Sequence, residues 1–237
     1  MCSTSETHDI RYLMIAKAGS STSRYVMKNS FDGQEKRCGK KDFTNSTKLH
    51  CTFTREPSSR FISSYQEMVV RGFVNNKNKH VPVKKKVPAK YDKFLQYFQN
   101  VPNKDQYNLL FDSTQGRQVL NDALEQFIQD YDAQIPFDGH LRLQIPRLTN
   151  PETGRTVRLD ALYDTTNMSS SFQELGNWVD MASPVEVIHG YDRGTKRMDI
   201  KELTLQTRQK ICQLSAIDCC CLNYELPPEC QNLVACR

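Results

Sequence analysis

The sequence predicts an α/β fold of three layers, in which a central parallel sheet is flanked by helices. Of the 237 residues, 38% are hydrophobic and 25% are charged, which suits a chain with one sizeable core or two small ones. A buried strand, a short loop and an amphipathic helix follow one another three times, and such units imply parallel strands. The chain has no internal repeat, so we expect a single domain over residues 1–237.

The first two units come early in the chain. An apolar run from Ile10 to Ala16 predicts a buried strand, and after a loop of small residues the apolar triplet 25–27 indicates a helix. In the second unit, the apolar positions 49, 51 and 53 alternate with polar residues, as a strand would. Pro57 suits the first turn of the helix that follows this strand.

The remaining elements are predicted in the same way. Alternation from Val157 to Tyr163 indicates the third strand, and Ser171 with Glu174 forms a capping-box pattern that would open its helix. Apolar residues at helical spacing predict further helices over 91–98, 119–131 and 203–217. The basic segment 75–93, which contains Lys84-Lys85-Lys86, is expected to be an exposed loop that is either merely solvated or recognises an anionic glycan.

Composition excludes several classes of protein. No apolar run approaches the roughly 20 residues that cross a bilayer, and the polar residues 1–8 lack the pattern of a signal peptide. The net charge of +5 favours anionic partners such as a nucleotide, a sulfated glycan or a nucleic acid. Nucleic acid is the weakest of these, because aromatic residues are not interleaved with the basic run.

The cysteines indicate a compartment. The chain has nine, and six of them lie in the Cys-rich C-terminal segment 212–237. Three consecutive cysteines at 219–221 suit a zinc site poorly, so disulfides in an oxidising compartment are the favoured interpretation. The glycosylation triplets that begin at Asn45 and Asn167 agree with that compartment.

The loop of the first unit is the first candidate binding site. A loop rich in Gly and hydroxyl groups between a strand and a helix has a phosphate-loop geometry, because backbone N–H groups and the helix N-terminus attract an anion. Lys17 precedes Gly19 rather than following it, so this is not the Walker A order and a magnesium-dependent kinase is disfavoured. An ordinary turn capped by Ser and Thr remains an alternative. The candidate residues are Lys17, Ala18, Gly19, Ser20, Ser21, Thr22 and Ser23.

The second unit offers a matching pair of donors. Arg55 lies at the end of a strand and Ser63 within the first turns of the next helix, a pairing suited to one terminal phosphate. Taken singly, Arg55 could instead pair with Glu56 or Glu67, and Ser63 could lie on a solvated helix face.

Together these segments resemble the Golgi carbohydrate sulfotransferases, a group within the family-2-like sulfotransferases. The loop reads Ala16-Lys-Ala-Gly-Ser-Ser-Thr-Ser23, with Ala16 where the family has Pro, and the second segment reads Arg55-Glu-Pro-Ser-Ser-Arg-Phe-Ile-Ser-Ser-Tyr65. Asp138-Gly-His-Leu-Arg-Leu-Gln144 is similar to the family's Asp-x-His-x-x-x-Gln stretch. Asp218-Cys-Cys-Cys-Leu-Asn-Tyr224 is similar to its C-terminal ending, with Cys219 and Cys220 in place of an aromatic and an aliphatic residue.

The resemblance implies an enzyme that transfers a sulfuryl group from 3′-phosphoadenosine 5′-phosphosulfate to a glycan hydroxyl. The 5′ end of this donor would bind the loop 17–23, and its 3′-phosphate would bind Arg55 and Ser63. Lys17 would stabilise the leaving oxygen, and no metal is expected. His140 is the favoured base because of its motif, although a structural histidine bonded to Asp138 is an equal alternative. Glu67 and His80 are the other candidates for the base.

The resemblance also carries expectations about cysteines and location. It favours a disulfide between Cys221 and Cys230 first and one between Cys38 and Cys51 second. Family members occupy the Golgi lumen through an N-terminal membrane anchor, which is not present before Lys17, so the chain is expected to be truncated, processed, secreted or active without an anchor. A catalytically silent protein that keeps the nucleotide fold and binds anionic glycans is the alternative function.

Overall fold

The fold was analysed in a computed structural model, which describes residues 1–38, 47–74, 87–133, 138–150, 152–188 and 196–233. The chain divides into two compact units. Unit 1 comprises Met1–Glu56 with Gln144–Asp192, and unit 2 comprises Pro57–Leu143 with Arg193–Arg237. The chain therefore passes from unit 1 into unit 2 just after Glu56 and returns at Gln144.

Unit 1 is built on a five-stranded sheet of order β3-β1-β2-β4-β5. The strands are β1 (Cys2–Ser5), β2 (Ile10–Leu13), β3 (Gln34–Lys36), β4 (Leu49–Thr54) and β5 (Ala161–Asp164). The three strands β2, β4 and β5 are parallel, and β1 pairs antiparallel with both β2 and β3. The predicted α/β class with parallel strands at the centre of the sheet is confirmed, and antiparallel β1 and β3 are additions to it.

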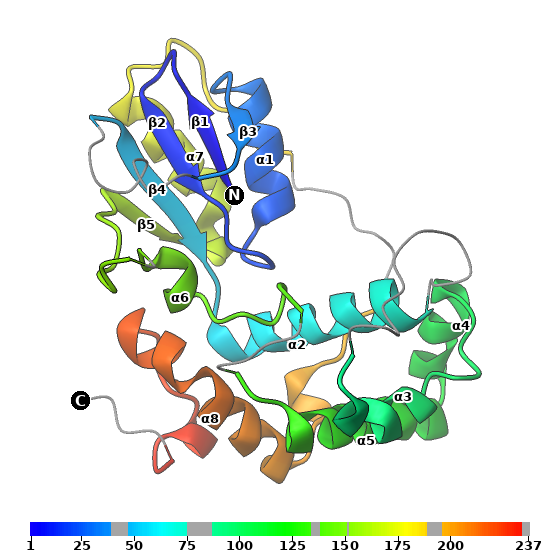
Figure 1. Ribbon diagram of the computed structural model, residues 1–237. Coiled ribbons are helices and arrows are strands. Elements are labelled where there is room, and N and C mark those ends of the chain that lie inside the picture. The colour runs from blue at the N-terminus through cyan, green and yellow to red at the C-terminus, as the bar shows by residue number, and fades with distance from the viewer. Residues whose placement is uncertain (39–46, 75–86, 134–137, 151, 189–195, 234–237) are drawn as a thin grey trace. The chain divides into compact units, whose positions relative to one another are not determined.

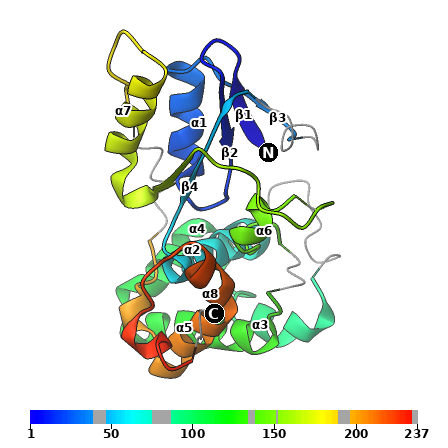
Figure 2. The ribbon, with the colours of Figure 1, turned by 90° about the vertical axis from the view of Figure 1, so that its left-hand side faces the viewer.

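One face of this sheet is covered by the two long helices of the unit, α1 (Ser20–Asn29) and α7 (Met168–Trp178), which lie on the same side of the strands (Figures 1 and 2). The core between them is apolar because alternate strand residues face the helices. It includes Tyr12, Phe53 and Phe172, with no exposed surface, and Ile10, Val26, Cys51 and Leu175. A helical layer on the opposite face stays a prediction. The short helix α6 (Ile145–Leu148) completes the helices described in this unit.

Unit 2 is helical in the residues described. Its helices are α2 (Pro57–Val69), α3 (Asp92–Gln96), α4 (Lys104–Leu109), α5 (Thr114–Asp130) and α8 (Leu205–Cys221), and α2 continues into a π-helical turn, Val70–Val74. Aromatic side chains dominate the core, where Phe127 stacks on Tyr91 and Tyr131 at centroid distances of 5.4 and 5.1 Å. The helices predicted over 91–98, 119–131 and 203–217 are present within shorter or shifted bounds, and Pro57 begins α2 as predicted.

Two local predictions are wrong. Ser171 does not open a helix, because α7 already begins at Met168 and the Ser171 hydroxyl donates to the carbonyl of Asn167 inside it. One disulfide joins Cys2 to Cys38 and another joins Cys212 to Cys230, so neither Cys221–Cys230 nor Cys38–Cys51 forms. Cys51 is a buried free thiol in β4 and Cys221 an exposed one at the end of α8, while Cys220 is disulfide-bonded. Most of the basic loop, residues 75–86, lies outside the described residues, as does Asn45.

Candidate functional site

The turn between β2 and α1 has the backbone geometry of an anion-binding loop. Lys17 and Gly19 both have left-handed backbone, with φ of 65° and 67°, and Gly19 is the N-cap of α1. As a glycine, this N-cap residue has no side chain with which to cap the helix terminus. The N–H groups of its first turn have no intrahelical acceptor, and together with the helix dipole they favour a negatively charged ligand.

Gly19 is needed for packing as well as for backbone conformation. A Cβ atom there would lie 2.7 Å from the sulfur and methyl group of Met168, at the start of α7, and 3.2 Å from Thr165. The loop therefore rests directly on the turn that joins β5 to α7. A Cβ at position 19 would therefore require the end of the Met168 side chain to shift.

The other candidates of the loop are divided between buried and accessible positions. Ala18 and Ser23 have no exposed surface and Thr22 is 7% exposed, whereas Ser20 and Lys17 are half-buried and Ser21 is exposed. Ser23 faces the buried hydroxyl of Tyr12, whose pKa is raised by desolvation although the contact with Ser23 opposes that shift. Lys17, Ser20 and Ser21 are thus the accessible side chains of the loop.

Arg55 follows β4, the parallel neighbour of β2, so the two candidate segments leave the sheet at the same edge. Its backbone is held by one buried side chain. The amide of Gln144 accepts from the Arg55 N–H at 3.0 Å and donates to the Arg55 carbonyl at 2.9 Å. Gln144 has no exposed surface, and both contacts are satisfied within unit 1. The arginine side chain itself is partly exposed.

Three arginines contribute positive charge near this edge, and one of them, Arg24, is paired with Glu35. The pKa of the Met1 amino group is lowered first by burial and then by the charges of Arg147, Arg24 and Arg37. Met1 is bonded through its carbonyl to the N–H of Met14, just beyond β2, so these arginines act near the end of that strand. An anionic ligand is stabilised by such positive charge.

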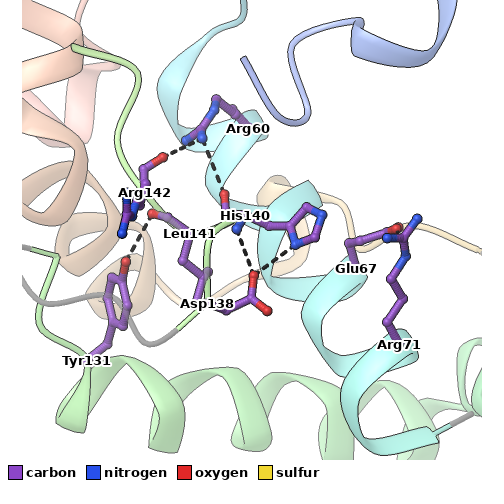
Figure 3. Close-up of polar contacts among 8 residues, drawn as sticks. All are labelled: Arg60, Glu67, Arg71, Tyr131, Asp138, His140, Leu141 and Arg142. Carbon is purple, nitrogen blue, oxygen red and sulfur yellow. Dashed lines mark hydrogen bonds and ion pairs between the residues drawn. The ribbon is translucent and has the colours of Figure 1, made fainter. Parts of the chain in front are cut away.

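Unit 2 contains the second group of candidates, among which His140 has the most developed surroundings (Figure 3). One oxygen of Asp138 accepts from the His140 N–H at 2.7 Å and lies 2.8 Å from its Nδ1. Burial alone would raise the pKa of Asp138, but these contacts with His140, and then the charge of Arg71, lower it overall. Both side chains are about one third exposed, at 33% and 32%.

The other predicted residues of unit 2 are less clearly placed for chemistry. Ser63 lies in the second turn of α2 and is partly exposed. Glu67, one turn further along, forms an ion pair with Arg71. His80 lies outside the described residues.

Two contacts were not foreseen from the sequence. Gln144 and Arg60 both belong to motifs of the resemblance, but neither had a predicted role. Arg60 is 2% exposed and binds backbone carbonyls of the segment that carries His140. The sequence offered one usable signal, which is a polar side chain next to apolar residues. Such a glutamine or arginine is buried only when its polar atoms are hydrogen-bonded, so a structural contact could have been predicted for each.

Comparison with known families identifies the class of protein. The model of the sulfotransferase family matches residues 2–213, which is most of the chain. No curated protein and no solved structure matches it. The chain belongs to the sulfotransferase family, and the class of reaction is sulfuryl transfer from a sulfonate donor to an acceptor.

Among the described residues, no group of three or more His, Cys, Asp or Glu side chains is placed to hold a metal ion. Within the same part of the chain, no helix has both the length and the apolar character needed to span a bilayer.

Proposed function

We propose that this sulfotransferase is a carbohydrate O-sulfotransferase that uses 3′-phosphoadenosine 5′-phosphosulfate as its donor. The observation that carries the proposal is the loop between β2 and α1, where left-handed Lys17 and Gly19 present a helix N-terminus at the strand edge from which Arg55 also emerges. This loop suits the 5′-phosphosulfate, because backbone N–H groups and a helix dipole stabilise an anion without a metal.

In this proposal Arg55 and Ser63 bind the 3′-phosphate. The guanidinium can donate two parallel hydrogen bonds to a phosphate, and the hydroxyl adds a third donor. The bonds from Gln144 fix the peptide of Arg55, so less conformational entropy is lost when its side chain binds. Loop residues 17–23 and Arg55 then account for the two anionic ends of one nucleotide.

The proposed reaction is an in-line displacement at sulfur. The acceptor oxygen forms a bond to sulfur while the bond from sulfur to the bridging oxygen of the donor breaks, and the electron pair leaves on the 5′-phosphate. Lys17 neutralises the charge that develops on this oxygen, and His140 takes the proton of the acceptor hydroxyl. The product nucleotide is 3′-phosphoadenosine 5′-phosphate.

The proposal also specifies the acceptor, a glycan, and the compartment, the lumen of the Golgi. Two disulfides, Cys2–Cys38 and Cys212–Cys230, support an oxidising compartment, and Asn167 is exposed at the start of α7 as a glycosylation acceptor would be. The net charge of +5 favours an anionic glycan over a neutral one.

The test is transfer of labelled sulfate from the donor to a panel of glycans, with and without a chelator. Lys17→Ala is expected to reduce transfer at least about a hundredfold while the nucleotide product still binds, because the lost interaction forms mainly in the transition state. Arg55→Ala is expected to weaken nucleotide binding itself. Lys28→Ala, at the far end of α1, and Arg158→Ala, before β5, are the matched controls.

Three results would contradict the proposal. Unchanged kinetics in both Lys17→Ala and Arg55→Ala would remove the loop and Arg55 from the donor site. Transfer to a phenol or an amine but to no glycan would remove the carbohydrate assignment. Loss of transfer on chelation would remove the prediction of metal-free chemistry.

A further inference from the structure

A buried guanidinium fixes the backbone of the segment that carries His140. Arg60, in the first turn of α2, is 2% exposed and donates through Nη2 to the carbonyls of His140, at 3.3 Å, and Arg142, at 2.5 Å. A buried charge is tolerated only when it is well hydrogen-bonded. These contacts lie inside unit 2 and join α2 to the turn 138–142 (Figure 3).

The carbonyl of Leu141, which lies between those of His140 and Arg142, accepts a hydrogen bond from the end of another helix. The hydroxyl of Tyr131, just after α5, donates to the carbonyl of Leu141 at 3.0 Å, and the Leu141 side chain is buried in the core of unit 2. Three consecutive carbonyls, at 140, 141 and 142, therefore accept from side chains of two different elements. A turn with no strand partner needs such donors, and here they fix the position of His140 relative to α2.

The ring of His140 is oriented by a separate contact. Asp138 accepts the Nδ1 proton and the backbone N–H of the same residue with one oxygen, because an ionised carboxylate only accepts. This leaves the lone pair of the neutral imidazole on Nε2. Figure 3 shows the ring extending from Asp138 on the side where Glu67 and Arg71 lie.

We propose that Arg60 and Asp138 are positioning residues for His140, Arg60 by fixing its backbone and Asp138 by fixing the tautomer that presents Nε2 as the proton acceptor. The inference rests on the proposed role of His140 as base, and it assigns Arg60, the motif residue between Arg55 and Ser63, to the acceptor chemistry rather than to the nucleotide.

The charged groups around His140 are consistent with Asp138 as the residue that fixes its tautomer. From α2, Glu67 and Arg71 neutralise each other in an ion pair, and the turn itself contributes Asp138 and Arg142 (Figure 3). Tyr131 is kept neutral because its pKa is raised, mainly by burial. The contact between Asp138 and His140 is therefore the one that selects a tautomer.

The first readout does not depend on activity. Long-range proton–nitrogen correlations of the full chain labelled at histidine report which ring nitrogen of His140 is protonated. The parent chain is expected to carry the proton on Nδ1. In Asp138→Asn the new amide can donate to Nδ1, so the proton is expected on Nε2. Asp105→Asn, on the exposed side of α4, is the control with an unchanged His140 signal.

The second readout is kinetic. Asp138→Asn is expected to lower kcat by at least about a hundredfold, the usual contribution of a general base, with binding of 3′-phosphoadenosine 5′-phosphate unchanged within about twofold. Arg60→Lys keeps the positive charge but loses the planar guanidinium that donates to two carbonyls. It is expected to lower kcat by about tenfold and to leave nucleotide binding unchanged. Arg117→Lys, which perturbs another arginine contact to a carbonyl in unit 2, controls for lost stability.

The combined effect of two substitutions on kcat distinguishes a positioning role of Asp138 from a merely structural one. Adding Asp138→Asn to His140→Gln should lower kcat no further than His140→Gln alone, and an additional drop would overturn the inference. A proton that stays on Nδ1 in Asp138→Asn, or a tenfold loss of nucleotide binding in Arg60→Lys, would also overturn it. If Asp138→Asn moves the proton while His140→Gln leaves kcat unchanged, the base assignment itself fails.

Discussion

The side-chain amide of Gln144 replaces a strand partner for the peptide of Arg55, accepting from its N–H and donating to its carbonyl. Arg55 comes directly after β4, at the point where the ladder of the sheet ends. Gln144 is fully buried. In its absence, the N–H and the carbonyl of Arg55 would lose these two hydrogen bonds. The glutamine therefore fixes the backbone from which the proposed phosphate ligand extends.

Gln144→Met should weaken binding of 3′-phosphoadenosine 5′-phosphate about tenfold and lower the free energy of unfolding by about 2 kcal/mol, because the Arg55 peptide loses two part-buried hydrogen bonds. Isothermal calorimetry and denaturant unfolding measure the two effects. Gln173→Met is the matched control, since Gln173 makes the same pair of bonds to Val185. It should lose stability and keep its nucleotide affinity. Equal affinity losses in both variants would show that Gln144 acts only through stability.

Gly19→Ala should reduce both stability and nucleotide affinity. The substitution forces a Cβ into Met168 and places alanine in left-handed backbone, which costs about 1 kcal/mol by itself. Gly154→Ala isolates the backbone term, because Gly154 has a φ of 65° and its Cβ would meet nothing within 4 Å. Thermal unfolding should show the larger loss at Gly19. Equal losses would mean that the contact with Met168 relaxes without cost.

The stability of the protein should depend on pH through Asp138. The folded-state pKa of this carboxyl is lowered, so its stabilising contribution is fully present above the unfolded-state value of about 3.9 and is lost as pH falls through the lower folded-state value. Denaturant unfolding at pH values from about 5 down to about 3 checks this. The difference in stability between the parent chain and Asp138→Asn should shrink over that range. A constant difference would contradict the assigned shift.

The free thiols should differ sharply in reactivity. Cys221 is exposed, whereas Cys51 is buried and its pKa is raised to about 12, first by burial and then by the charge of Asp160. At about pH 8, iodoacetamide should modify Cys221 in the folded protein and reach Cys51 only after unfolding, because the thiolate is the nucleophile. Peptide mass spectrometry reads the sites, with Cys221→Ser as the control. Rapid modification of Cys51 in the folded chain would contradict its burial.

Disulfide reduction should have a measurable cost. Cys2–Cys38 closes 36 residues and Cys212–Cys230 closes 18, and bridges of this kind stabilise by about 2–4 kcal/mol. Paired substitutions to Ser, compared by denaturant unfolding, should each lower the free energy of unfolding. Unaltered unfolding of the Cys212→Ser, Cys230→Ser double variant would contradict the pairing in unit 2.

The predicted central strands and the loop after β2 followed from local pattern, because an apolar run or an apolar–polar alternation marks a strand and a turn into a helix needs small residues. The strands β1 and β3 were missed for the same reason. Ser3, Thr4 and Ser5 are polar yet buried, since β1 lies between two other strands, and no alternation marks them. Ser171 illustrates the converse case, in which a capping pattern lies inside a helix that began three residues earlier.

What the sequence alone determined was the α/β class and the family to which the chain belongs, together with the candidate residues of the loop 17–23, Arg55 and His140. These depend on residue type and short spacing. Only the tertiary structure decided the cysteine pairs and the hydrogen-bond partners of Gln144 and Arg60. Those contacts join residues 18 to 89 positions apart, and their formation depends on which backbone groups the packing leaves without a partner.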